Sequence, residues 1–294
     1  MKRILAALLV SLVLAAGLEA ESSVWKVTRN GRVLYLGGTC HYLRAADLPL
    51  PPEFDAAFAQ AAVVCFETDL AQLQSPETQQ KLVAQALYTD GSKLSDALTP
   101  EAWQAVQNWA TKSGLPAAQL QSFKPWMVMM TIMGVELQRL GFTPEGVDQQ
   151  FQKKAIAARK RLAQLETVEE QIGFVTSLGA GQESELLVAT LADLARLPAV
   201  LGDTVAAWRI GDLDKLDATL SAEMRRDYPR IYATLISNRN KVWLPKLETM
   251  LASEPKELVL VGAAHLAGND GLIALLRKKG CTIEQVPAPA ATAP

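Results

Sequence analysis

The chain has 294 residues, of which 49% are apolar and 20% are charged, and this is the composition of an ordinary globular protein. Lysine and arginine together number 29 against 31 aspartates and glutamates, so the formal net charge is −2. This balance argues against a nucleic-acid-binding protein and against binding to an anionic membrane surface. Glycine (18) and proline (15) are too few for a fibrous or disordered chain.

The first 20 residues have the layout of a secretory signal peptide. Met1-Lys2-Arg3 gives a positive start, an apolar run extends from Ile4 to Gly17, and Ala20 provides a small residue for cleavage. The alternative is an uncleaved membrane anchor, but the run has only about 14 residues and a spanning helix needs about 20. We therefore expect cleavage after Ala20, a mature chain without an integral membrane anchor, and a periplasmic or secreted location.

The first part of the mature chain has strand patterns. Residues 24–28 and 33–36 are rich in β-forming side chains and are joined by Asn30-Gly31, which predicts a hairpin. Residues 53–62 have helical spacing. A short apolar run then ends in Glu67, which is typical of a central parallel strand followed by a polar residue.

Helical patterns dominate from about residue 76 to about residue 250. Within this stretch, residues 145–160 predict a helix and residues 161–166 a short strand that ends in Glu166. Strands at 257–262 and 282–286 flank a helix at 271–279, and the Pro/Ala-rich residues 287–294 predict an unstructured tail. We expect one α/β domain over residues 21–286, with a central, mostly parallel sheet and a large helical insertion.

A short motif occurs twice, near the two ends of the predicted domain. Gly38-Thr-Cys-His41 and Gly262-Ala-Ala-His265 each follow a predicted strand, and they contain the only two histidines of the chain. Each glycine would let the chain turn sharply or approach a ligand closely. The shared context favours a common functional role over two unrelated structural histidines.

The predicted topology places four ionisable residues at one edge of the sheet. His41, Glu67, Glu166 and His265 each lie at or just past the end of a predicted strand, and open α/β sheets bind ligands at that edge. Two histidines with a glutamate are typical of catalytic metal sites that leave a position open for water. A second carboxylate would be a further ligand or the general base. Arg239, judged by its own surroundings in the sequence, is expected to be a solvated helix residue.

The three cysteines are an odd set for an oxidising compartment. Two states are compatible with Cys40, Cys65 and Cys281: one disulfide with one free thiol, or three buried thiols. Their spacings match no metal-binding pattern such as Cys-x-x-Cys. Cys65 lies within an apolar strand, which favours a role in the core.

Several motifs follow one another over nearly the whole mature chain. They are Val24-Trp-Lys-Val, Tyr35-Leu-Gly-Gly-Thr-Cys-His41, Val63-Val-Cys-Phe-Glu67-Thr-Asp69, Gly146-Val-Asp148-Gln, Leu165-Glu166-Thr167-x-x-Glu170-Gln171, Asn238-Arg239-Asn240-x-x-Trp243 and Val261-Gly-Ala-Ala-His265-Leu. In these motifs and their order the chain resembles the TraB/GumN family, which is related to the TIKI proteases of animals. One departure is Cys40, where the family usually has an aliphatic residue.

The resemblance implies an α/β core with paired Gly-x-x-His motifs and a largely helical insertion. It implies divalent-metal-dependent peptidase activity, and it places His41, Glu67, Glu166, Arg239 and His265 at the characteristic positions of the family. The wider group is similar to erythromycin esterases and to a haem-binding iron-uptake protein.

The first hypothesis is an exported metal-dependent hydrolase, specifically a peptidase, acting on a peptide or small-molecule substrate. His41, Glu67 and His265 would hold zinc, manganese, cobalt or iron, Glu166 would be the base or a fourth ligand, and Arg239 would stabilise the oxyanion. The alternatives are a non-catalytic haem- or metal-binding protein of the cell envelope, and an envelope accessory factor that has kept the fold without the activity.

Overall fold

The computed structural model describes residues 22–289, so the predicted signal peptide and residues 290–294 of the predicted tail lie outside the described residues. Within this range six strands form one mixed sheet. In sheet order the strands are β4 (Arg161–Gln164), β3 (Val63–Phe66), β5 (Glu257–Gly262), β2 (Arg32–Thr39), β1 (Val24–Arg29) and β6 (Thr282–Gln285). The four strands from β4 to β2 are parallel, whereas β1 is antiparallel to both β2 and β6. The predicted α/β fold with a mostly parallel sheet is confirmed.

The turn between β1 and β2 is the hairpin that the Asn-Gly pair predicts. Asn30 and Gly31 both have positive φ angles, +51° and +76°. Two consecutive positive φ angles define the tight turn whose twist matches that of the flanking strands. The turn thereby sets the pairing of Arg29 with Arg32, and the register continues to Val24 opposite Gly37.

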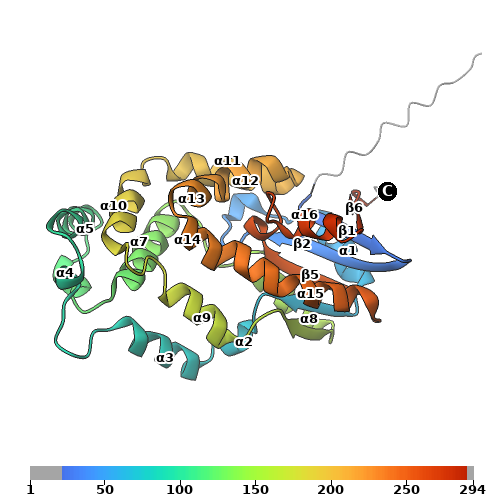
Figure 1. Ribbon diagram of the computed structural model, residues 1–294, viewed down its shortest axis with the longest axis horizontal. Helices are drawn as coiled ribbons and strands as arrows, with labels where there is room; N and C mark the ends of the chain where they lie inside the picture. Colours follow the sequence, from blue (N-terminus) through green and yellow to red (C-terminus); the bar gives the residue numbers. More distant parts are fainter. Residues whose placement is uncertain (1–21, 290–294) are drawn as a thin grey trace, which may run out of the picture.

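Helices cover both faces of the sheet, and the alternation along β5 shows how. Leu258 and Leu260 pack in one core cluster with α1 (Pro52–Gln60) and α8 (Val147–Ala157). Val259 and Val261 pack in a second cluster with α15 (Asn238–Ala252) and α16 (Leu272–Lys278). Because β5 is buried on both faces, its residues 258–261 are continuously apolar. Figure 1 shows α15 and α16 in front of the sheet in that view.

The remaining helices form most of the predicted insertion, which lies beside the sheet (Figure 1). They are α2 (Leu70–Leu73), α3 (Pro76–Ala86), α4 (Leu94–Ala97), α5 (Pro100–Lys112), α6 (Ala117–Leu120), α7 (Pro125–Arg139), α9 (Val168–Thr176), α10 (Glu183–Asp193), α11 (Leu197–Ile210), α12 (Leu213–Leu220), α13 (Ala222–Asp227) and α14 (Pro229–Tyr232), with the short elements η1 (Ala45–Asp47), η2 (Ala233–Ser237) and η3 (Ala263–His265). Helices α5, α7 and α10 share a third core cluster, separate from the sheet. The large helical insertion is confirmed.

One tryptophan of the insertion ties it to the sheet. Trp208 on α11 is fully buried, and its indole Nε1 donates a hydrogen bond of 2.6 Å to the carbonyl oxygen of Gly38 in β2. The Ser23 hydroxyl donates in turn to the carbonyl oxygen of Trp208 at 2.6 Å. The ring also lies 5.9 Å from that of Phe54 on α1. These contacts fix the end of β2, the strand that leads to His41.

Two chain-wide features complete the fold. All three cysteines are free thiols, with Cys65 and Cys281 buried and Cys40 half-buried, so the structure matches the alternative without a disulfide. In the part of the chain that the structure describes, no helix combines the length and the apolar character needed to cross a bilayer.

We predict that Trp208→Phe lowers the free energy of unfolding by about 2–3 kcal/mol, because it leaves the buried Gly38 carbonyl without its donor and removes core volume. Urea denaturation followed by circular dichroism measures this loss. Trp103→Phe, at a half-buried position on α5, is the control and should cost less than about 1 kcal/mol. Equal losses in the two variants would contradict the anchoring role of Trp208.

Candidate active site

The predicted site residues follow the ends of the four parallel strands. His41 comes two residues after β2, Glu67 directly after β3, Glu166 two residues after β4, and His265 ends η3 after β5. Because these strands are parallel neighbours, their carboxyl ends form one edge of the sheet. Arg239 reaches the same edge from the first turn of α15. Glu67, Glu166, Arg239 and His265 are all buried, whereas the side chain of His41 is 56% exposed.

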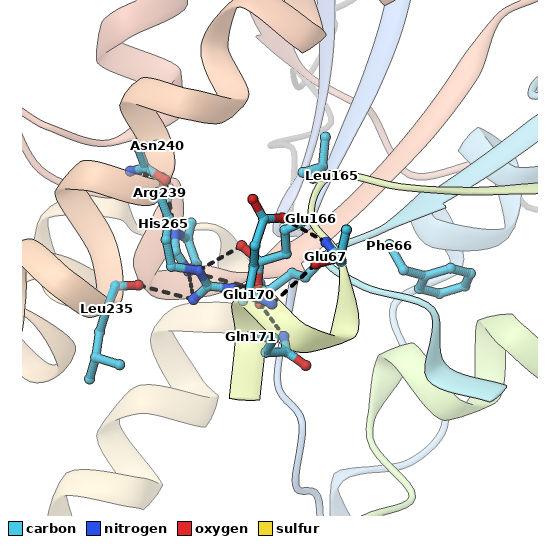
Figure 2. Close-up of polar contacts among 12 residues, drawn as sticks. Phe66, Glu67, Leu165, Glu166, Glu170, Gln171, Leu235, Arg239, Asn240 and His265 are labelled. Carbon is cyan, nitrogen blue, oxygen red and sulfur yellow. Dashed lines mark hydrogen bonds and ion pairs between the residues drawn. The ribbon is translucent and has the colours of Figure 1, made fainter. Parts of the chain in front are cut away.

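The guanidinium of Arg239 is the centre of the buried cluster (Figure 2). Its Nε and one Nη2 hydrogen donate to the two oxygens of Glu166 at 3.0 and 2.7 Å, a bidentate pair. Nη2 also donates to Glu67 Oε2 at 2.6 Å, and Nη1 donates to His265 Nε2 at 3.0 Å. The group lies 4.6 Å from the ring of Trp243, a cation–π contact. The arginine that sequence reasoning expected to be solvated is therefore buried and fully paired.

A π-helix supplies the last acceptor of Arg239. The turn η2 (Ala233–Ser237) precedes α15 and is wound as a π-helix, in which carbonyl groups bond one residue further along the chain. The carbonyl oxygen of Leu235 accepts instead from Arg239 Nη1 at 3.0 Å. All five N–H donors of the guanidinium thus have acceptors, which holds it in one orientation.

The tautomer of His265 follows from its hydrogen bonds. The Asn240 amide nitrogen donates to the carbonyl oxygens of His265 and Asp270 at 3.1 and 2.8 Å, so the amide oxygen faces His265 Nδ1 at 2.7 Å. Nδ1 must therefore carry a proton, and Nε2 is left with the lone pair that accepts from Arg239. Burial lowers the pKa of His265 to about 3 although Glu67 is close, so the ring is neutral at neutral pH.

The two carboxyl groups of the cluster differ in environment. Burial by itself would raise the pKa of Glu67, but the positive charges of His265 when protonated, of Arg239 and of His41 outweigh it and lower this pKa to about 2. The backbone N–H of Gly262 also donates to Glu67 Oε1 at 2.7 Å. Burial raises the pKa of Glu166 against the opposing effect of Arg239. Glu67 is thus the firmly ionised group of the pair.

His41 is held by a neighbour that sequence reasoning missed. Its Nδ1 lies 2.8 Å from Oδ2 of Asp148 in the first turn of α8, and this carboxylate raises the pKa of His41 to about 9. Helix α8 is seated directly on the histidine loop, because the Val147 N–H donates to the Cys40 carbonyl oxygen at 3.1 Å. A Cβ on Gly146 would lie 2.2 Å from that same oxygen, so only glycine allows this close approach.

Gly262 lies between His41 and the buried cluster. A Cβ built on it would lie 3.2 Å from His41 Nε2, 3.3 Å from Glu67 Oε1 and 3.7 Å from His265 Cδ2. Its φ of −50° and ψ of 137° are open to other residues. Of the two roles expected for the motif glycines, close approach therefore applies at this position. The missing side chain lets both histidines and Glu67 approach this residue closely.

Sequence reasoning gave no role to three further polar residues. They are Asp148, Gln171, whose Nε2 lies 3.5 Å from Glu67 Oε2, and Asn240. Each belongs to one of the quoted motifs, next to or near a residue that was assigned a role. A buried histidine needs a partner for each ring nitrogen, and for His265 this requirement is the signal that points to Asn240.

We predict a pH-dependent stability difference between the metal-free wild type and Asp148→Asn. The carboxylate raises the pKa of His41 to about 9 from an unfolded value near 6.5, so it stabilises the protonated fold. This contribution is fully present below pH 6.5 and is lost as the pH rises through about 9. Unfolding measured between pH 6 and 10 should show the difference shrinking, and NMR titration should show a lower His41 pKa in the variant. A constant difference would contradict the pairing.

Comparison with known proteins agrees with the motifs. A TraB/PrgY/gumN family model matches residues 23–285. The chain is 25% identical over 323 residues to metalloprotease TIKI1 of Danio rerio, covering 92% of this chain and 64% of that protein. It is 25% identical over 324 residues to metalloprotease TIKI1 of Homo sapiens, covering 92% and 63%. The chain thus spans less than two thirds of the length of these relatives, and no solved structure matches it. The chain belongs to the TraB/PrgY/gumN family.

Proposed function

We propose that this protein is an exported, divalent-metal-dependent hydrolase that cleaves peptide bonds. The observation that carries the proposal is that His41, Glu67 and His265 all lie close to Gly262, at the carboxyl edge of the sheet. The curated relatives named metalloproteases support the same class of reaction. The signal-peptide pattern of residues 1–20 supports export.

The donor groups near Gly262 are of the type that binds a divalent cation. His41 has Nδ1 occupied by Asp148, and His265 has Nδ1 occupied by Asn240, so Nε2 is the atom that each ring would offer to a metal. Metal-ligating histidines are typically oriented in this way by a partner on the other nitrogen. Among the described residues, however, no three acidic, histidine or cysteine side chains are close enough to share an ion. Arg239 takes the lone pair of His265 and one oxygen of Glu67.

A metal held by His41, Glu67 and His265 would supply an activated water and polarise the carbonyl group of the substrate. The rest of the chemistry belongs to the chain itself. Arg239 places a fixed positive charge beside the reacting group, and because its donors are all paired it acts through charge rather than through a new hydrogen bond. Both carboxylate oxygens of Glu166 accept hydrogen bonds from Arg239. To act as a base or as a fourth metal ligand, Glu166 would have to give up one of these hydrogen bonds.

The haem-binding alternative gains no support from the geometry. The cavity beside the cluster, bordered by Glu166, Arg239 and Trp243, has a volume of about 120 Å³. Small-molecule and cofactor sites typically need about 300–1,000 Å³.

We predict that the wild type purified from the cell envelope carries close to one equivalent of a divalent metal, and that the His41→Ala/His265→Ala variant has lost it. Mass spectrometry of the metal content measures both. Cys40→Ala is the control and should keep the metal, because burial, with Asp148 and Asp47 nearby, raises the pKa of this thiol and keeps it protonated. Equal trace metal in wild type and double variant would refute the metal dependence.

We predict that Arg239→Met lowers peptide hydrolysis by about 10²–10³-fold, because it removes the fixed cation. It should also lower the free energy of unfolding by about 3–5 kcal/mol at pH 7, since Glu67 and Glu166 lose their buried partner. Without Arg239 the pKa of Glu67 is less depressed, so the stability loss should shrink as the pH falls below about 4.

The matched control is Arg225→Met. Arg225 makes an equally short bidentate pair with Asp217, at 2.9 and 2.8 Å, but at a partly exposed position. Its loss should cost about 1 kcal/mol or less and leave hydrolysis unchanged. Full hydrolytic activity in a folded Arg239→Met protein would contradict the role of the buried charge.

A further inference from the structure

A small cavity adjoins the buried cluster on the side of helices α9 and α15. Its volume is about 120 Å³, and its walls include Phe174 of α9 together with Val242 and Trp243 of α15. Glu166 and Arg239 form part of the same lining, so the cavity shares a wall with the candidate active site.

The charged groups of this cavity are already paired. The five donors of Arg239 and both oxygens of Glu166 are used within the cluster. The carboxylate of Glu170 accepts from the Thr167 N–H at 2.8 Å, which caps α9. An anionic group entering the cavity would therefore meet two carboxylates and a guanidinium whose donors are all used, and it would lose its hydration without gaining a partner, which is costly. The rest of the lining is the exposed Asn238 and the apolar Phe174, Val242 and Trp243, so the favoured occupant is uncharged and largely apolar.

Val242 lines the cavity without packing in the hydrophobic core. Its side chain is 56% exposed, whereas Trp243, Leu247 and Leu251 on the same helix pack in the core cluster beneath the sheet face. An apolar occupant would cover Val242 and the half-buried ring of Phe174. Burial of this surface stabilises binding by about 25 cal/mol per Å² of apolar area removed from water.

The volume limits the occupant to a single side chain. A cavity of about 150 Å³ lined by apolar residues accepts one benzene molecule. At about 120 Å³ this cavity suits a branched or thioether aliphatic group such as that of leucine or methionine, and it is too small for a whole ligand.

We propose that this cavity is a specificity subsite, which takes an uncharged aliphatic side chain of the substrate next to the bond that is cleaved. The inference rests on the proposed hydrolase for the reaction, but the binding it describes depends only on the cavity. Phe174 and Trp243 form the rigid aromatic walls, and Val242 forms the side at which the group enters. Substrates with glycine at this position would lack the buried contact.

Val242→Trp tests the subsite, because a larger side chain at this exposed position fills the cavity without disturbing the core. The control is Val83→Trp on α3, where the valine is 53% exposed and does not line the cavity. Binding is measured by calorimetry with N-acetyl-leucinamide and N-acetyl-glycinamide. Cleavage of a defined peptide mixture, read by mass spectrometry, gives the preference for leucine or methionine over glycine.

Wild type and Val83→Trp should favour the leucine compound and leucine-containing cleavage sites by about 10- to 100-fold. In Val242→Trp both preferences should fall to within about threefold of unity. An unchanged preference in Val242→Trp, or none in wild type, would overturn the subsite. If leucinamide is favoured and Val242→Trp removes this preference, but no peptide is cleaved in the presence of metal, the subsite stands and the proposed hydrolase fails.

Discussion

The buried charge of Arg239 is the interaction on which the whole edge of the sheet depends. Its guanidinium has five N–H donors, and their acceptors come from four different parts of the fold: both oxygens of Glu166, one of Glu67, the His265 ring and a carbonyl of the π-helix. A buried ion pair is stabilising only when such additional bonds compensate for lost hydration. The same bonds hold the ends of β3, β4 and β5 together. A substitution of Arg239 is therefore expected to change both the proposed reaction and the local stability at this edge of the sheet.

The two histidines show that a repeated motif does not give a repeated environment. His41 is half exposed beside a carboxylate, which raises its pKa, whereas His265 is buried beside an amide and is kept neutral. Charge dominates in the first case and desolvation in the second. Near neutral pH one copy of the motif therefore carries a proton and the other does not. The two histidines beside Gly262 therefore differ in charge although they belong to the same motif.

The features that could be predicted from the sequence are those set by local chemistry. The Asn30-Gly31 turn, the buried strand that ends in Glu67 and the alignment of four polar residues at the strand ends follow from turn chemistry and hydrophobic periodicity. The environment of Arg239 could not be derived in this way, because its partners come from distant segments and from a π-turn that ordinary helical spacing does not reveal. The Asp148 contact likewise depends on the close approach of Gly146 to the Cys40 carbonyl. Only the family resemblance pointed to Arg239 beforehand.

The π-helical turn Ala233–Ser237 constrains the number of residues that this segment can have. Successive residues of an α-helix are separated by about 100° of rotation and 1.5 Å of rise. Loss of one residue from the wide turn would let the helix close into regular α geometry and would rotate everything before it, relative to Arg239 and Asn240, by about one such step. The number of residues in the turn is therefore fixed by the side chains that follow it, independently of which residues fill the turn.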